Sequence, residues 1–301
     1  TELKDWAAKQ PARVRRWVES ADFNAAPHRL CPIPDGEGGL DRVLLGVDPD
    51  DPIHRYSSLP EKLPPGRYRI EAKLTGKEAT GAAIGFGLGA YRFTRYRADD
   101  RPLRKLVWPA GADRSQVLRV LEATFLVRDL INTPANDMGP AELAAAARKL
   151  ARRHKAKCTV LIGDALLKKN YPTIHMVGRA SDQAPRLVDM VWGKASDPKV
   201  TLVGKGVCFD TGGLDLKTAA SMRLMKKDMG GAAQVLGLTH MIMDAKLPVR
   251  LRVLIPAVEN SVSANAMRPS DIVRTRKGLT VEIGHTDAEG RLVLCDALTE
   301  A

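Results

Sequence analysis

Two short segments of the chain, residues 203–232 and 285–292, gather charged side chains directly after apolar, strand-like runs. They read VGKGVCFDTGGLDLKTAASMRLMKKDMGGA and HTDAEGRL. Several carboxylates brought together repel one another, and each is costly to remove from water. Divalent cations are the usual remedy, and ligation by carboxylates without Cys or His suits Mn, Mg or Zn. The pattern therefore predicts a metal centre, whose candidate ligands are Lys205, Asp210, Asp228, Asp287 and Glu289.

The sequence around these residues indicates how they are positioned. Lys205 follows an apolar run at 200–203, and Asp210 stands just ahead of a Thr-Gly-Gly sequence that indicates a tight turn. A second apolar run, at 279–283, precedes the HTDAEGRL segment. We expect two strands to deliver both segments to one end of a sheet. A lysine among such carboxylates can ligate a cation only as the neutral amine, which nearby cations favour by lowering its pKa.

These motifs resemble those of the leucyl aminopeptidase family, the cytosol aminopeptidases of peptidase family M17. The family pattern NTDAEGRL reads HTDAEGRL here, and the Lys-Asp-Lys-Asp spacing of the first segment matches throughout. Upstream, RDLINTPAN at 128–136 resembles the interdomain signature of the family. GAYRFTRY at 89–96 resembles a motif of its first domain. The similarity extends from about residue 83 to residue 301.

The resemblance implies a di-metal aminopeptidase that removes N-terminal residues from peptides, with leucine and other apolar residues favoured. One divalent ion, Mn or Zn, would be held by Lys205, Asp210, Asp228 and Glu289. The other would be held by Asp210, Asp287 and Glu289. A water or hydroxide between the two ions would be the nucleophile.

The resemblance also implies roles for residues around the metals. Lys217 would donate to the scissile carbonyl oxygen as that oxygen becomes an oxyanion. Arg291 would hold a bicarbonate ion that acts as general base. Asp228 would lie close to the free α-amine of the substrate, and Met225 would line the pocket for its first side chain.

Simpler interpretations of the same residues stay open. Asp228, ahead of Met-Gly-Gly, could cap a helix, and Lys217 could be a surface lysine. Arg291 could favour a helix terminus or pair with Glu289. Cys208, inside the first segment, is interpreted as a packing residue, with a ligand role as the alternative.

His285 departs from the family, which usually has Asn at that place. A histidine beside metal ligands invites assignment as a zinc ligand. Because the ligands of the family already complete the site, we expect a supporting or packing role instead. The change bears on the geometry of the loop and on the preference for one metal over another.

Length, charge and cysteine usage narrow the class of protein. A chain of 301 residues suggests two domains. Its 47 basic and 35 acidic residues give a net charge of +12. The basic residues are spread along the chain and form no recognisable nucleic-acid-binding motif, so we interpret them as residues of solvated faces rather than as a DNA-binding surface. Four scattered cysteines without a CxxC pair are typical of reduced residues in a cytosolic protein. No apolar run is long enough to cross a bilayer and no signal-peptide pattern is present, so we predict a cytoplasmic protein with no membrane partner.

Alternation of predicted strands and helices favours an α/β fold. Residues 1–112 are predicted as a small α/β domain, 113–136 as a linking helix, and 137–301 as a doubly wound α/β catalytic domain. Helices are predicted at 5–19, 115–131, 141–154, 164–169, 232–245 and from 292 onwards. Strands are predicted at 41–47, 67–74, 82–88, 158–162, 173–177, 187–192, 200–207, 251–255 and 279–283.

Two further expectations follow from the resemblance. Family members continue well beyond the position of residue 301, so we expect further chain to complete the sheet and the substrate cleft. The family forms hexamers, which implies a homo-hexamer. Two other functions stay as alternatives: a DNA-binding regulatory protein that keeps the peptidase fold, and a di-metal hydrolase of non-peptide amides.

Overall fold

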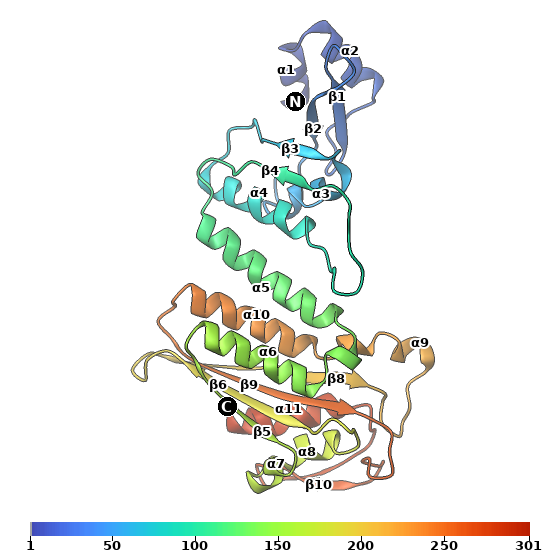
Figure 1. Ribbon diagram of the computed structural model, residues 1–301, viewed down its shortest axis with the longest axis vertical. Helices are drawn as coiled ribbons and strands as arrows, with labels where there is room; N and C mark the ends of the chain where they lie inside the picture. The colour runs from blue at the N-terminus through green and yellow to red at the C-terminus, as the bar shows by residue number, and fades with distance from the viewer. Residues whose placement is uncertain (1) are drawn as a thin grey trace. The chain divides into compact units, whose positions relative to one another are not determined.

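The computed structural model describes residues 2–301 and divides into two compact units, 1–121 and 122–301. Both units mix helices and sheet, as the sequence predicts, and the second unit carries the α/β sheet (Figure 1). Helix α5 (Arg114–Asn132) crosses the division between them and confirms the predicted helix at 115–131. The domain boundaries at 112 and 136 stay a prediction. Within the described residues, no helix is both long and apolar enough to span a membrane.

The first unit contains two small two-stranded sheets, one antiparallel (β1 with β2) and one parallel (β3 with β4). The helix predicted at 5–19 is two helices, because Pro11 lacks the N–H that a continuous helix needs there. The strand predicted at 67–74 is only three residues long. The elements are α1 (Glu2–Ala8), α2 (Ala12–Ser20), β1 (Leu30–Pro34), β2 (Leu40–Leu45), η1 (His54–Tyr56), α3 (Leu59–Lys62), β3 (Gly66–Tyr68), α4 (Gly76–Gly89) and β4 (Arg104–Leu106).

The strand predicted at 82–88 is wrong: these residues belong to helix α4. Thr75 and Glu78 form a reciprocal capping box that starts the helix. Gly81, Gly85 and Gly89, four residues apart, lie on one face against the 52–57 backbone, where a Cβ at Gly85 would meet the Ile53 carbonyl oxygen at 1.8 Å. The glycines of this segment therefore serve close helix packing.

The second unit is built on a five-stranded mixed sheet in the order β5-β6-β9-β7, with β8 also paired to β9. Strands β5, β6 and β9 are antiparallel neighbours, whereas β7 and β8 both run parallel to β9. The strands are β5 (Lys157–Ile162), β6 (Arg186–Trp192), β7 (Lys199–Val203), β8 (Gly206–Asp210) and β9 (Arg250–Asn260). The predicted strand at 200–207 is thus two strands, β7 and β8, which pair with successive parts of β9.

Helices cover both faces of this sheet, which confirms the doubly wound α/β prediction (Figure 1). On one face α6 (Pro140–Arg153) and α10 (Gly230–Asp244) pack on Met190, Val253 and Ile255. On the other face α8 (Pro172–Gly178) and α11 (Glu289–Glu300) pack on Leu187, Val207 and Val258. Neighbouring residues of β6 and β9 point to opposite cores, as strand geometry requires.

Two strand predictions in this unit are wrong in type or place. Residues 173–177 lie in helix α8, which begins at Pro172 in the first helical turn, where proline is favoured. The run at 279–283 forms β11 (Thr280–Glu282), which pairs antiparallel with β10 (Ile272–Arg274) in a separate two-stranded sheet. The remaining elements are η2 (Ala135–Asp137), α7 (Ala165–Lys168), α9 (Ala219–Met222) and η3 (Met225–Lys227).

Candidate metal centre

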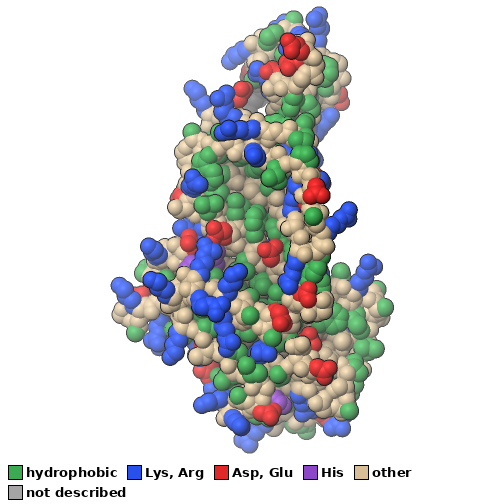
Figure 2. Space-filling view, viewed as in Figure 1, with side chains coloured by type: hydrophobic (Ala, Val, Ile, Leu, Met, Phe, Trp, Pro, Cys, Tyr) green, Lys and Arg blue, Asp and Glu red, His purple; other side chains and the backbone are tan. Residues whose placement is uncertain are grey.

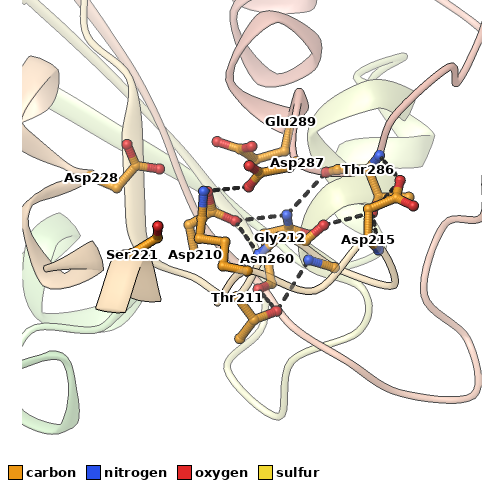
Figure 3. A network of polar contacts seen from close by, with 12 residues as sticks. Asp210, Thr211, Gly212, Asp215, Ser221, Asp228, Asn260, Thr286, Asp287 and Glu289 are labelled. Carbon is orange, nitrogen blue, oxygen red and sulfur yellow. Dashed lines mark hydrogen bonds and ion pairs between the residues drawn. The ribbon is translucent and has the colours of Figure 1, made fainter. Parts of the chain in front are cut away.

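Three carboxylates from two distant segments converge beyond the end of β8. Asp210 is the last residue of β8, Asp287 lies in the loop before α11, and Glu289 is the first residue of α11. Each offers an oxygen, and these oxygens lie within 4.8 Å of one another (Figure 3). Asp210 and Glu289 are buried, at 2% and 1% exposure. Buried acidic groups this close need a compensating charge.

Two lysines supply that charge and divide the carboxylates into two pairs. The Lys205 ammonium lies 2.8 Å from Asp228 and 2.7 Å from Glu289. The Lys217 ammonium lies 3.1 Å from Asp210 and forms a short ion pair with Asp287. All four acidic residues predicted as ligands, together with both lysines, therefore form one cluster.

The lysines and carboxylates shift one another's proton affinities. Burial raises the pKa of Glu289 to about 7, opposed by Lys205 and reinforced by the Asp210 charge. Burial also raises the pKa of Asp210, although Gly212 and Asn260 donate hydrogen bonds to it. Burial works to lower the pKa of each lysine, but the paired carboxylates outweigh it, so the pKa values of Lys205 and Lys217 lie above their usual value. Both lysines are therefore cationic in this arrangement.

Lys205 lies at the break between β7 and β8. The Gly204 N–H donates to the Leu254 carbonyl on β9, so the chain stays attached to the sheet at this break. The Lys205 carbonyl accepts from the Ala232 N–H in the first turn of α10. A Cβ at Gly290 would lie 2.9 Å from the Lys205 ammonium nitrogen, so only glycine leaves room for the side chain. Glycine residues thus shape the slot that points this lysine at the carboxylates.

A second network holds the turn after Asp210. The Asn260 side-chain amide, at the end of β9, donates to an Asp210 oxygen at 2.8 Å and to the Thr286 carbonyl at 3.1 Å. The Thr286 hydroxyl donates to the Gly212 carbonyl at 2.6 Å, and its N–H donates to Asp215 at 2.7 Å (Figure 3). These bonds tie the two ligand-bearing segments together without using an oxygen of Asp287 or Glu289. Gly212 has φ +88°, a conformation that glycine adopts without strain.

Asn260, Asp215 and Thr286 belong to the site but are not singled out by sequence reasoning. Asn260 is only 2% exposed, and it ends a longer strand than the predicted run at 251–255. One sequence signal could have identified Asn260: it is a polar residue at the end of an apolar strand, and ligand sites of α/β sheets lie at the ends of neighbouring strands.

Three buried oxygens of the cluster have ion-pair contacts but lack a well-formed hydrogen bond, and they fit a metal. Asp228 Oδ2, Asp287 Oδ1 and Glu289 Oε1 are buried and, although close to a lysine ammonium, accept no well-oriented hydrogen bond. Buried acceptors of this kind are rare in proteins and call for an explanation. Carboxylate oxygens and one amine are a donor set that suits Mn, Mg or Zn. The residues present therefore fit a centre for divalent cations.

The remaining predicted residues lie around the cluster. Met225 is half-buried at the start of η3, and Arg291 is exposed in the first turn of α11. The His285 ring accepts from the Asp287 N–H at 3.1 Å and is 61% exposed. Cys208 lies in the core under α6 and α10, where burial raises the pKa of its thiol well above the usual value. This position gives no support to a ligand role for Cys208.

An open cavity of about 530 Å³ adjoins the cluster. Its wall includes Lys217 and Asp287 from the cluster, together with Thr218, Ser221 and His285. A small molecule in this cavity would reach the side chains of Lys217 and Asp287 directly.

Comparisons of the sequence with known proteins all point to one family. Residues 125–301 match the catalytic domain of the cytosol aminopeptidase family, and residues 1–109 match the N-terminal domain of M17 aminopeptidases. A probable cytosol aminopeptidase from Sinorhizobium fredii is 41% identical over 241 residues, which are 75% of this chain and 48% of that protein. The chain thus spans about half the length of the curated relatives it matches.

Solved structures give the same result. The crystal structure of a cytosol aminopeptidase from Coxiella burnetii is 48% identical, with a TM-score of 0.92 over 99% of this chain and 65% of that one. The bottromycin maturation enzyme BotP, solved in complex with Mn, is 33% identical with a TM-score of 0.84, over 94% of this chain and 65% of that one.

Proposed function

Because the chain belongs to the cytosol aminopeptidase family, we propose that it forms the metal-binding part of an aminopeptidase that removes N-terminal residues from peptides. The observation that carries this proposal is the convergence of Asp210, Asp287 and Glu289 beside the ion-paired lysines Lys205 and Lys217. The Mn in the BotP structure supports a divalent metal in a related site.

In this proposal two divalent ions, Mn or Zn, occupy the cluster. Lys205, Asp210, Asp228 and Glu289 would hold one, and Asp210, Asp287 and Glu289 would hold the other. When bound, the ions would lower the pKa of a water and polarise the scissile carbonyl. Lys205 has to give up a proton to ligate, so metal uptake and proton release are coupled at this residue.

Lys217 would act on the substrate rather than on a metal. Its ammonium lies in the cavity wall between Asp210 and Asp287, within reach of a bound peptide. When those carboxylates are engaged elsewhere, the ammonium is free to donate to the carbonyl oxygen of the scissile bond. That oxygen gains negative charge during attack, so the interaction is stronger in the transition state than in the ground state.

Three residues would orient the substrate and the general base. Asp228, at the edge of the cluster, would accept from the free α-amine, which restricts cleavage to the N-terminal residue. Met225 would contact the first side chain and favour leucine and other apolar residues. Arg291, exposed beside Glu289, would hold bicarbonate as the general base. We also propose a cytoplasmic homo-hexamer, in keeping with the family.

Hydrolysis of leucine amide and of N-acetyl-leucine amide by the Mn-loaded protein tests this function. We expect cleavage of the first, almost none of the second, and loss of activity with a chelator. Equal cleavage of both would point instead to a hydrolase of other amides.

Substitution of the carboxylates tests the site itself. Glu289→Ala and Asp287→Ala should abolish activity and lower the metal content, because fewer oxygens then screen the repulsion between the cations. Glu282→Ala removes an exposed acid of β11 nearby and should behave as wild type. A fully metallated and active Glu289→Ala protein would overturn the assignment.

A further inference from the structure

The second unit has another cavity at the end of the sheet opposite the carboxylate cluster. It has a volume of about 500 Å³ and is lined at three chain turns: the end of α6, the turn after β6 and the end of α10. Trp192 at its wall pairs with Leu251 of β9, whereas Asp210 pairs with Asn260 of the same strand. Nine residues of strand separate the two places by roughly 30 Å. The cavity is therefore a separate site.

The walls of this cavity combine an apolar floor with positive charge. Apolar surface comes from Trp192, Met243, Leu247 and Pro248. Basic side chains stand around it, and Figure 2 shows Lys and Arg gathered on the side of this unit where Figure 1 places the turn after β6. The charged lining residues are Arg153, Lys155, Lys194, Asp197 and Lys246.

The positive charge of the cavity is not balanced. Arg153 pairs with Glu122, which neutralises it. Within residues 2–301, none of Lys155, Lys194 and Lys246 forms an ion pair. Among the described residues that line the wall, Asp197 is the single acid, so the wall carries a surplus of positive charge, with Asp244 as a further acid close by. A phosphate monoester carries about −1.5 to −2 at neutral pH, which matches this surplus.

Two of the lysines occupy positions where glycine is the default. Lys155 (φ 56°) follows α6 and Lys246 (φ 52°) follows α10, both in the left-handed conformation. A cation near a helix C-terminus favours the helix dipole, and this explains a lysine near each end. It does not explain the left-handed placement, nor Lys194, which lies on the turn after β6. The property that Lys155, Lys194 and Lys246 share is their position in the wall of this cavity.

We propose that this cavity binds a small phosphate-bearing molecule with an aromatic body, the class to which nucleoside monophosphates belong. The lysines would bind the phosphate, and the aromatic group would pack on Trp192 and Leu247. This site goes beyond the aminopeptidase function proposed above and does not depend on it.

Titration calorimetry with AMP, adenosine and inorganic phosphate tests the proposal. We expect saturable binding of one AMP per chain, weakened by salt, with adenosine and phosphate each at least tenfold weaker. Trp192 is the one tryptophan among residues 122–301, so AMP should change its fluorescence and Trp192→Phe should abolish that change. Equal affinity for phosphate and AMP would overturn the aromatic part of the proposal.

Matched variants locate the binding. Lys155→Gly with Lys246→Gly suits the left-handed backbone, so the melting temperature should hold or rise while AMP affinity falls about tenfold or more. Lys277→Ala, an exposed lysine outside the cavity, should bind AMP as wild type. Asp210→Asn, at the metal cluster, should also leave AMP binding unchanged. No saturable binding, or wild-type binding by the double glycine variant, would overturn the proposal.

Discussion

Gly290 lies directly against Lys205: a methyl group added at residue 290 would come within 2.9 Å of the lysine ammonium nitrogen and its Cε. Contacts that close are essentially never seen for real side chains, so one of the two groups has to move. The lysine is the flexible partner, and its displacement would break its ion pairs with Asp228 and Glu289.

Gly290→Ala should therefore lower metal affinity and activity by about tenfold or more, which is typical when a group that orients a ligand is disturbed. Gly284→Ala is the matched control, because a Cβ at 284 meets nothing within 4 Å. Metal titration followed by steady-state kinetics measures both effects. Wild-type metal binding by Gly290→Ala would contradict a ligand role for Lys205.

The two lysines of the cluster should differ when each is replaced. Lys217→Ala should keep its metal and lose kcat by roughly 10²–10³, the usual cost of removing one oxyanion donor. Lys205→Ala should instead lose metal from one of the two sites. Equilibrium dialysis with steady-state kinetics on both variants decides the matter. Metal loss from Lys217→Ala with full occupancy in Lys205→Ala would show that the two roles are reversed.

Asn260 should be important for both folding and metal binding. Asn260→Ala removes the amide donor of the Thr286 carbonyl and one of the two donors to an Asp210 oxygen, so the free energy of unfolding should fall by about 1–3 kcal/mol. Asn265→Ala, which removes an exposed amide that bonds the Arg179 carbonyl, should cost less. Urea unfolding of both variants, with metal removed, gives the comparison. Equal stability of the two would contradict the role of Asn260 in holding the turn.

A pair of neighbouring histidines, His240 buried and His154 half-buried, should make stability depend on pH. His154 Nε2 lies 2.9 Å from His240 Nδ1, and burial is the main cause that lowers the pKa of both rings. A lowered pKa means that the unfolded chain binds the proton more readily, so stability is complete above about pH 6.5 and falls as the pH drops below it. His240→Gln should therefore lose less stability than wild type between pH 7.5 and 5.5 in urea unfolding. An unchanged pH dependence in this variant would contradict the expectation.

Sequence reasoning was most successful where chemistry restricts the choice of residue. Asp210, Asp287 and Glu289 can be predicted as neighbours because a group of acids after apolar runs has few stable explanations, and the structure brings them together. The helices predicted at 115–131, 141–154 and 232–245 are confirmed as α5, α6 and α10, and the first was predicted from apolar positions at helical spacing.

The errors arise where local preference and tertiary contact disagree. Residues 173–177 are rich in strand-forming side chains, yet Pro172 and packing against α11 make them helical. The glycines of α4 reflect contact with the 52–57 backbone, which no local pattern reveals. Asn260 escaped prediction for a similar reason, since its partners Asp210 and Thr286 are distant in sequence.

The ion pairs of Lys205 and Lys217 bear on the order of folding and metal binding in the proposed function. Two ammoniums offset half of the charge of four acids, and Asn260 and Thr286 hold the turn, so contacts within the chain already connect the ligand-bearing segments. Small zinc domains, in contrast, stay unfolded until the metal arrives. At the proposed metal site, an ion would therefore meet ligands that are already neighbours, and the cations available around the folded protein would decide which ion it holds.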